Sequence, residues 1–469
     1  MRTIDHYENS FRRVALLIAV ALVVAPLAQA ADGDIDTTFG VGGFELINWK
    51  TPGDVIPNSV AIDAAGRIVI AGQAQNYNAS GQPTDADFVL TRLLPDGQVD
   101  TSFAADASGY RLVDFALAGI GANSVSVAND LAIQPDGRIV AAGCAYFDTV
   151  HSHFAAIRVD NTGNLDSTFG GNGTVHFGFS FADIDCANAA LLDGLGNIVL
   201  AGELGYDHGS AGFDYLGAVA RLTPAGALDP AFNSGYVLEF LYWAQPPQQA
   251  QFNFAYAAGI DGSGRIVAAG ETDTPNPMSG AAVRLTSAGV LDSGFGQSSR
   301  MLVPVSGSEV GAVFVEPSGD SLLAGAGSVG PQSVIFVAKY APDGTLDPAF
   351  GSNGVASIPA SASVPTLIAP THAGGWLVAG PYARAGVFLA KLQANGQVDP
   401  TFGSGGYLTV AFQPSTIFDA RKPALQPDGK LVVAGHLPEA ANNGTADFGV
   451  MRILADYDTI FANGFETEP

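Results

Sequence analysis

The 469-residue sequence predicts an all-β fold made of repeated units, and three observations support this prediction. First, the stretch QPDGRIVAAG at 134–143 returns almost unchanged as QPDGKLVVAG at 426–435. Second, apolar residues alternate in short runs, and no helical periodicity occurs after residue 30. Third, 58 glycines and 27 prolines punctuate a chain that is 47% hydrophobic and 14% charged, which is typical of a globular protein dense in turns.

Seven copies of the repeated stretch can be aligned, and each ends in Ala-Gly after a short apolar run. The first three intervals between these glycines are 71, 59 and 68 residues, and the last three are 55 residues each. The sequence is therefore an array of small supersecondary repeats, and the insertions fall in the early repeats. The terminal glycines are Gly72, Gly143, Gly202, Gly270, Gly325, Gly380 and Gly435.

The repeated stretch itself predicts a buried hairpin. Residues 131–133 alternate as a strand, Pro135-Asp136-Gly137 forms a turn, and residues 139–142 return as a second strand. The recurring Ala-Gly indicates that two backbones approach closely there, because a bulkier side chain would overpack at a cost of about 1–3 kcal/mol.

A third strand follows each Ala-Gly and ends in a basic residue, and in the first six units an Asp-x-x-Phe motif begins eight residues later. The seventh basic residue is Arg452, and one further Asp-x-x-Phe motif begins at Asp36. A turn between the two places positions eight apart opposite each other, so we expect a cross-strand ion pair that fixes the strand register. As an exposed pair, each would contribute about 0.2–1 kcal/mol. The alternative is that each aspartate binds calcium or acts as an acid catalyst, but recurrence in every unit favours the structural role. The predicted pairs are Arg92 with Asp100, Arg158 with Asp166, Arg221 with Asp229, Arg284 with Asp292, Lys339 with Asp347, and Lys391 with Asp399.

A fourth strand follows Asp-x-x-Phe, as at 173–177, and four antiparallel strands per unit describe a blade. We therefore predict a seven-bladed β-propeller over residues 31–457, because a closed ring buries each sheet face on the next one and protects the strand edges. An open solenoid would need polar caps, and neither end of the chain offers one. Residues 44–47 either complete the last blade or open the first, and the sequence leaves this choice open.

Residues 1–30 predict a secretory signal peptide. Arg12 and Arg13 precede an apolar run at 14–25, and Ala28-Gln29-Ala30 matches a cleavage site after Ala30. The apolar run is too short to span a bilayer, which requires about 20 residues. We expect a soluble protein that is secreted or periplasmic.

Cleavage at this site leaves 17 basic and 43 acidic residues, a net charge of about −26. Such a surface repels phosphate backbones and anionic lipid, which excludes nucleic-acid and membrane partners. We expect a monomer without a required cofactor, although this acidic surface is compatible with calcium. The expected partner is a protein or a glycan.

The repeat pattern, roughly L-x-P-D-G-x-x-V-A-G and then P-D-G-x-x-D-x-x-F-G, resembles the bacterial delta-60 repeat family. The resemblance extends from Asp34 to Ile453. It implies an exported propeller and implies no catalytic residues and no defined substrate. The tail at 458–469 resembles a carboxy-terminal ending of exported gammaproteobacterial proteins, I-F-x-x-G-F-E, and it equally fits a shortened further Asp-x-x-Phe motif.

A few residues outside the repeat are candidates for chemistry. His151 and His153 alternate on one side of a strand, and His208 lies in the comparable loop of the next unit, so they are weak candidates for a zinc or copper site. Because no cysteine or third histidine lies close in sequence, a solvated loop is the favoured interpretation. Cys144 and Cys186 lie at the same end of neighbouring hairpins and either form a disulfide or remain free thiols.

Two functions remain open at this point. The first is a non-enzymatic binding or scaffold protein that engages a protein, glycan or cation on its rim or channel mouth. The second is a hydrolase or lyase, with or without a metal, whose site lies in the central channel. Because unrelated functions share the propeller fold, the side chains that reach the central axis must distinguish the two.

Overall fold

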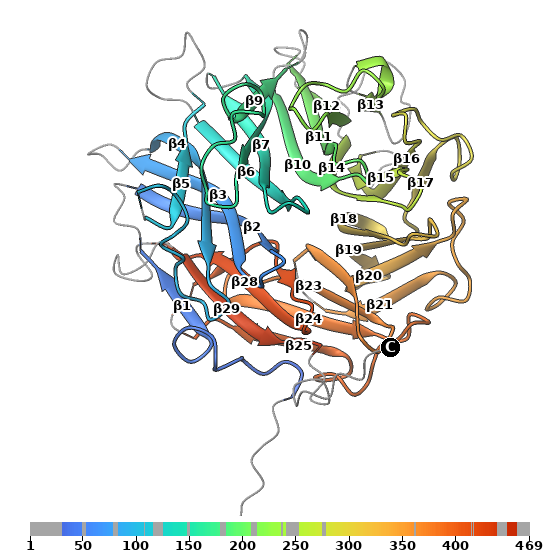
Figure 1. The fold of residues 1–469 in the computed structure, drawn as a ribbon. Helices are drawn as coiled ribbons and strands as arrows, with labels where there is room; N and C mark the ends of the chain where they lie inside the picture. Colours follow the sequence, from blue (N-terminus) through green and yellow to red (C-terminus); the bar gives the residue numbers. More distant parts are fainter. Residues whose placement is uncertain are drawn as a thin grey trace, which may run out of the picture.

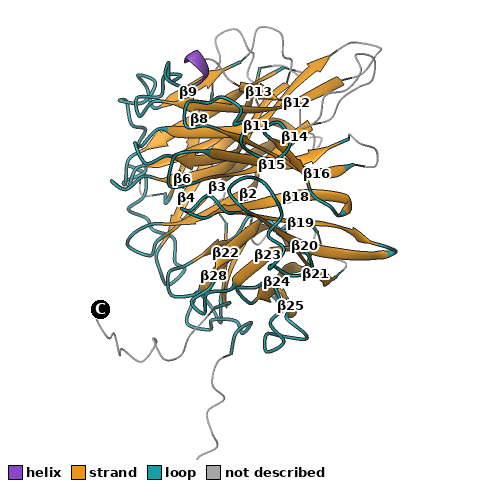
Figure 2. Ribbon diagram, turned by 90° about the vertical axis from the view of Figure 1, so that its right-hand side faces the viewer, coloured by secondary structure: helices purple, strands orange, loops and turns teal. Residues whose placement is uncertain are grey.

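The computed structural model describes residues 31–48, 53–77, 83–106, 108–115, 125–147, 151–178, 184–207, 213–235, 238–240, 253–273, 278–360, 363–413, 415, 417–438 and 448–456. The predicted signal peptide, His208 and the tail at 458–469 lie outside these residues. The described chain is almost entirely β-strand, with one short 3-10 turn at Asn233–Gly235 (Figure 2). Among the described residues, no helix has the length and apolar character needed to cross a bilayer.

Four strands in chain order form the repeating sheet, which we call a strand group. In one group, β6 (Val125–Ile133) pairs antiparallel with β7 (Ile139–Tyr146), β7 with β8 (Ser152–Val159), and β8 with β9 (Thr174–Phe177). The predicted Pro-Asp-Gly turn joins β6 to β7, where Gly137 has φ +84° and its N–H donates to the carbonyl of Gln134 at 2.8 Å. A positive φ at this position explains the glycine of the repeat.

The same order recurs along the chain, with these strands: β2 (Gly53–Ile62), β3 (Ile68–Tyr77), β4 (Pro83–Leu93), β5 (Tyr110–Val113); β10 (Ile184–Leu192), β11 (Ile198–Asp207), β12 (Phe213–Leu222), β13 (Leu238–Phe240); β14 (Asn253–Ile260), β15 (Ile266–Thr272), β16 (Ser279–Leu285), β17 (Arg300–Leu302); β18 (Ser306–Val315), β19 (Ser321–Val329), β20 (Gln332–Tyr340), β21 (Val355–Pro359); β22 (Leu367–Pro370), β23 (Trp376–Tyr382), β24 (Gly386–Leu392), β25 (Tyr407–Ala411). Figure 1 shows these groups around a common centre, with first strands such as β6, β10 and β18 nearer the middle than last strands such as β13.

The final group is built from both ends of the described chain. Its strands β26 (Asp419–Ala420), β27 (Ala424–Leu425), β28 (Lys430–His436) and β29 (Phe448–Leu454) come from the carboxy-terminal part. The outer strand is β1 (Phe44–Ile47), which pairs antiparallel with β29 (Figure 1). Of the two roles that the sequence left open for residues 44–47, the structure shows completion of the last group.

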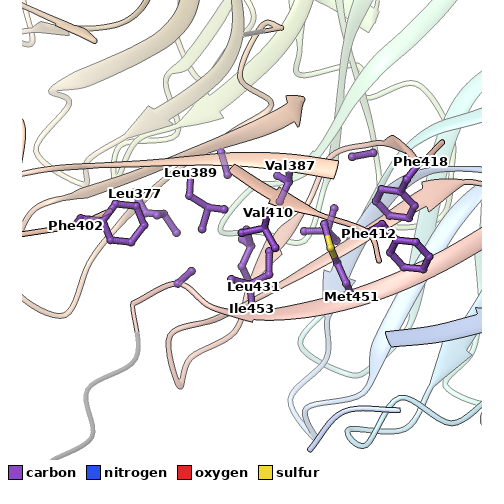
Figure 3. Close-up of a cluster of buried hydrophobic side chains, with 14 of the residues drawn as sticks. Leu377, Val387, Leu389, Phe402, Val410, Phe412, Phe418, Leu431, Met451 and Ile453 are labelled. Atoms are coloured by element: carbon purple, nitrogen blue, oxygen red, sulfur yellow. The ribbon is translucent and has the colours of Figure 1, made fainter. Parts of the chain in front are cut away.

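Hydrophobic side chains fill the space between consecutive groups. One such cluster packs Leu389 of β24 and Val410 of β25 against Leu431 of β28 and Met451 of β29 (Figure 3). Another packs β28 and β29 against β2, β3 and β4, so the last group is buried on the first. The main apolar burial therefore occurs between neighbouring sheets, which explains why no single group carries its own core.

The first strand of most groups contains a β-bulge. In β6, Ala128 pairs with Gly143 and Asp130 pairs with Ala142, so the residue between Ala128 and Asp130 has no partner in the register. One residue is skipped at the equivalent place in β2, β10, β14 and β18. The repeated glycine of the second strand lies directly against this bulge. A Cβ on Gly143 would overlap the carbonyl oxygen of Val127. The close backbone approach expected from Ala-Gly is therefore the contact between the second strand and the bulge.

Replacing Gly143 with alanine is expected to lower the free energy of unfolding by at least about 1–3 kcal/mol, because the added methyl group must displace backbone rather than a flexible side chain. Gly194→Ala is the control, since a Cβ there meets nothing within 4 Å and the residue has no positive φ. The control should change stability by less than about 1 kcal/mol. Urea denaturation of both variants measures the difference, and equal stabilities would contradict the overlap.

Candidate functional site in the central channel

The first strands line a cavity at the centre of the ring. Its volume is about 480 Å³, within the roughly 300–1,000 Å³ of small-molecule pockets. The lining residues come from or adjoin β2, β6, β10, β14, β18, β22 and β26. The polar side chains that line it are Asn58, Asn129, Asp130, Asn188, Tyr256, Glu309, Thr366, Arg421 and Lys422.

The β-bulges decide which side chains line the cavity. In β2, β6, β10, β14 and β18, the residue skipped at this bulge is a lining residue and lies fourteen positions before the repeated glycine of its group. Sequence reasoning missed these positions, although counting back from the glycine would have found them. The full set at this spacing is Asn58, Asn129, Asn188, Tyr256, Gly311, Thr366 and Arg421.

Three asparagines connect consecutive groups around the cavity wall. The Nδ2 of Asn58 donates to the carbonyl of Ala128 at 2.9 Å, and the Nδ2 of Asn129 donates to the carbonyl of Ala187 at 3.0 Å. Asn188 continues the series by donating to the carbonyl of the next first strand at 3.2 Å. Because each amide is anchored by its neighbour, this part of the wall presents amide groups in fixed positions.

A cluster of carboxyl groups adjoins Tyr256 on one side of the cavity. The Tyr256 hydroxyl donates to Glu271 Oε1 at 2.7 Å, and the Asn188 amide donates to Glu203 Oε2. Glu309, from the following group, lines the cavity itself. These three glutamates come from β11, β15 and β18, which belong to successive groups.

Burial makes these carboxyl groups weak acids. It raises the pKa of Glu203 to about 8, and burial together with the nearby Glu271 carboxylate raises the pKa of Glu309 to about 7. Burial also raises the pKa of Glu271 and, with the Glu271 bond, the pKa of Tyr256. A carboxyl group that is protonated near neutral pH can donate a hydrogen bond and carries no charge.

Two cations lie on another part of the wall. Lys422 Nζ is 2.7 Å from Asp130 Oδ2, and the buried Asp130 also accepts bonds from Ser59 Oγ at 2.7 Å and from the Ala190 N–H at 3.0 Å. Arg421 also lines the cavity, where its side chain is exposed. The cavity is therefore electrostatically uneven, with protonatable carboxyl groups in one sector and cations in another.

Four of the predicted arginine–aspartate pairs lie outside the channel, between groups. Arg92 Nε is 2.8 Å from Asp100 Oδ2, its guanidinium lies 4.7 Å from the Phe103 ring, and its second nitrogen donates to the carbonyl of Asn161 in the next group. We call this arrangement an arginine clamp. The same clamp forms at Arg158 with Asp166 at 2.8 Å, Arg221 with Asp229 at 2.7 Å, and Arg284 with Asp292 at 2.8 Å.

The clamps differ from the expectation in their burial. Only 2% of the Arg92 side chain and 7% of the Asp100 side chain are exposed, so the pair is not a surface ion pair. The hydrogen bonds of Asp100 to Ser102 and Arg92 lower its pKa despite the opposing effect of burial. Each clamp consequently holds the next group's turn as well as its own register.

The two lysine copies do not follow the predicted pairing. Lys339 Nζ lies 3.5 Å from Glu316 rather than beside Asp347, and Lys391 Nζ contacts Asp32 at 2.5 Å and Asp456 at 2.7 Å rather than Asp399. The physical reason is that an ammonium is a point charge on a flexible stem, whereas a guanidinium can bond an aspartate and a carbonyl simultaneously.

A fifth arginine clamp, which the eight-residue spacing could not reveal, closes the ring. Arg452 Nε is 2.8 Å from Asp36 Oδ2, its second nitrogen donates to the Pro95 carbonyl at 2.5 Å, and it lies over Phe39 at 4.7 Å. The basic residue and its Asp-x-x-Phe motif lie at opposite ends of the described chain. Sequence analysis recognised both motifs but had no spacing by which to pair them.

The histidine candidates are arranged differently from the expectation. His153 Nδ1 lies 3.1 Å from Nδ1 of His176 on β9, whereas the His151 ring stacks on Phe147 at 5.6 Å. Burial lowers the pKa of both His153 and His176. Within the described ranges, no group of three or more histidine, cysteine or acidic side chains is arranged to hold a metal ion.

A disulfide joins Cys144 of β7 to Cys186 of β10, with the two Cα atoms 4.7 Å apart. It therefore links consecutive groups beside the channel. The Nδ2 of Asn129 lies 3.2 Å from the Cys186 sulfur, so the disulfide contacts one of the three asparagines that line the cavity.

The strand groups and their central channel define a β-propeller repeat protein. The family model described as "Domain of unknown function (DUF5122) beta-propeller" matches residues 66–103, 134–169, 318–350 and 426–456. Each matched segment except the last ends at or near the phenylalanine of an Asp-x-x-Phe motif, so the matches coincide with the repeats. No curated protein matches the chain.

Solved structures with similar folds share little sequence with this chain. A protein of unknown function from Dyadobacter fermentans DSM 18053 is 15% identical, with a TM-score of 0.42, covering 87% of this chain and 97% of that one. A PL25 ulvan lyase is 10% identical, with a TM-score of 0.43 and coverages of 92% and 98%. The aldose sugar dehydrogenase of Streptomyces coelicolor is 12% identical, with a TM-score of 0.35 and coverages of 78% and 97%.

Proposed function

We propose that the protein is an exported, monomeric β-propeller of the delta-60 repeat type, with seven blades over residues 31–457. The seven Ala-Gly repeats, the strand groups and the hydrophobic clusters between consecutive groups support this blade number. Residues 12–30 support cleavage of a signal peptide after Ala30 and a secreted or periplasmic location.

We propose further that the channel binds a saccharide without transforming it. The observation that carries this proposal is the convergence of amide, hydroxyl and carboxyl groups from successive blades on one cavity of about 480 Å³. A sugar ring offers many hydroxyl groups, and anchored amides such as Asn129 and Asn188 provide complementary donors and acceptors. The ring of Tyr256 provides an aromatic face against which the apolar face of a sugar can pack.

The outer surface offers less support for a protein partner. The exposed large hydrophobic residues of the described chain are scattered: Leu195 and Val290 lie in separate turns, and others such as Val329 lie in separate strands. Single exposed apolar residues are ordinary on soluble proteins, whereas protein interfaces have contiguous apolar patches. A concave polar cavity instead favours a small polar ligand.

Binding is expected to depend on Tyr256 and Asn188. We expect the purified protein to bind at least one oligosaccharide on a glycan array, and Tyr256→Ala and Asn188→Ala each to weaken that binding about tenfold, which corresponds to about 1.4 kcal/mol of lost contacts. Isothermal titration calorimetry with the array hit measures the affinity.

Asn172→Ala is the matched control for Asn188→Ala, because Asn172 caps an exposed turn away from the cavity. The Asn172→Ala variant should bind the saccharide with the same affinity as the unmodified protein. Thermal unfolding of each variant verifies that the fold is retained. Absence of any saccharide ligand, or equal losses in the control, would reject the channel as a saccharide site.

A hydrolase or lyase is the second candidate, and the carboxyl cluster favours it. Glu309, with its pKa near 7, is suited to proton transfer, and the Tyr256 hydroxyl, which is hydrogen-bonded to Glu271, lines the same cavity. Incubation of the array ligand with the protein distinguishes the two candidates. New reducing ends or unsaturated sugars would indicate an enzyme, whereas unchanged ligand would indicate binding alone.

A further inference from the structure

The strongest clue to the ligand is the separation of charge across the channel. Lys422 and Arg421 are consecutive, and both line the cavity. Their backbones are fixed, because the Arg421 N–H donates to the Ala434 carbonyl at 3.0 Å and the Lys422 N–H donates to the Asn58 carbonyl at 3.3 Å. The two cations are therefore held at one place on the wall.

Asp130 fixes the position of the lysine without removing the positive charge of this sector. Its carboxylate is 98% buried and accepts bonds from Ser59, Ala190 and Lys422. Asp130 and Lys422 neutralise each other as a pair, and the Arg421 guanidinium adds a positive charge beside them. A guanidinium presents a planar fork of donors that matches a carboxylate.

The opposing charges near the channel must also be counted. Glu309 faces Glu271 on β15, which raises its pKa, and Tyr256 on β14 interacts electrostatically with both of them and with Glu203 on β11. Other charged groups nearby form pairs, with Asp54 beside His436 at 2.7 Å and Asp419 beside Arg384 at 2.7 Å. Asp419 also interacts electrostatically with Arg421, so it offsets part of the positive charge of this sector. The carboxyl sector is therefore the part of the channel whose charge changes near neutral pH.

Building on the proposed saccharide site, we propose that the ligand is an acidic saccharide whose uronate carboxylate binds Arg421 and Lys422 while its sugar ring lies toward Tyr256. A carboxylate balances the positive charge of Arg421, and the protonated Glu309 carboxyl group, which also lines the cavity, can donate to a sugar hydroxyl group. The protein carries a formal net charge of −25, so an anionic ligand finds its complement in this local cationic sector rather than over the whole surface.

Trigalacturonic acid and its methyl ester provide a direct test by calorimetry at about pH 6, because esterification removes the negative charges and leaves the sugar hydroxyl groups in place. The acid is expected to bind at least about tenfold more tightly than the ester. Arg421→Gln should lower the affinity for the acid about tenfold and leave the affinity for the ester unchanged. Arg67→Gln is the control, since Arg67 pairs with Asp63 at a surface turn and lies outside the cavity.

The affinity for the acid is also expected to fall as pH rises from about 6 to 9, the range spanning the raised carboxyl pKa values. The pKa of Glu309 is about 7 and that of Glu203 about 8, so both groups are mainly neutral at the lower pH and negative at the higher pH. Deprotonation of Glu309 removes a donor from the cavity wall, and deprotonation of both groups adds negative charge that repels a carboxylate. Glu309→Gln should reduce this pH dependence.

The outcomes separate this inference from the proposed function. Equal binding of acid and ester, tighter binding of the ester, or an unchanged acid affinity in Arg421→Gln would overturn the acidic ligand and leave the saccharide site standing. A glycan array that yields only neutral ligands would do the same. An array that yields no ligand at all would overturn both.

Discussion

Replacing Arg452 with alanine is expected to lower the free energy of unfolding by about 3–5 kcal/mol, because it removes the guanidinium that bonds the buried Asp36 carboxylate and leaves Lys430, 3.6 Å away, as its cationic partner. The side chains of this pair are only 7% and 6% exposed, so water cannot substitute for the guanidinium. The substitution also frees the Pro95 carbonyl and the face of Phe39, both of which the arginine contacts. Urea denaturation, monitored by circular dichroism, measures the change.

Two further variants make this experiment specific. Arg384→Ala removes a guanidinium that is 69% exposed and pairs with Asp419, and it should cost no more than about 1 kcal/mol. Arg92→Ala removes an equivalent buried clamp whose arginine and aspartate are only eight residues apart, whereas Arg452 and Asp36 come from opposite ends of the described chain. A loss in Arg452→Ala as small as that in Arg384→Ala would contradict the role of the closing clamp. A loss equal to that in Arg92→Ala would show that each clamp acts locally.

Replacing both Cys144 and Cys186 with alanine is expected to destabilise the oxidised protein by about 4 kcal/mol in the chain-entropy description, given the 42 residues between them. The disulfide limits the conformations of the unfolded chain and joins two consecutive strand groups. Thermal and urea unfolding of the oxidised protein and the double variant measure the difference.

Reduction of the unmodified protein is the internal control. A reductant should lower its stability toward that of the double variant, whereas the double variant should not respond. Full stability in the double variant, or a response of that variant to reductant, would contradict a stabilising disulfide. Calorimetry with the saccharide ligand then shows whether loss of the contact between Asn129 and the disulfide also weakens binding.

Much of the repeat unit was predictable because its determinants are local. Gly137 requires a turn with positive φ, and the Ala-Gly that ends at Gly143 requires a close backbone neighbour. Arg92 and Asp100, eight residues apart across one turn, also meet as expected. In each case the interacting groups are separated by a short segment whose conformation the sequence specifies.

The channel residues were harder to predict because they do not repeat. The position fourteen residues before the glycine holds asparagine, tyrosine, glycine, threonine or arginine in different groups. Only the β-bulge gives these positions a common direction, and a bulge leaves no fixed residue type at the skipped position. Attention to the repeated motifs alone therefore pointed away from the candidate site.

By itself, the sequence determined the repeated hairpin, the third strand with its basic residue and the Asp-x-x-Phe turn, since each depends on residues close together in the chain. The tertiary structure decided that β1 completes the last group, that Asp36 meets Arg452, and that Lys391 pairs with Asp32 and Asp456. It also decided that Glu271 lies close enough to Glu309 to raise the pKa of Glu309. The physical reason is that these contacts exist only once the strand groups surround a common centre, and that curvature is a property of all the group interfaces together.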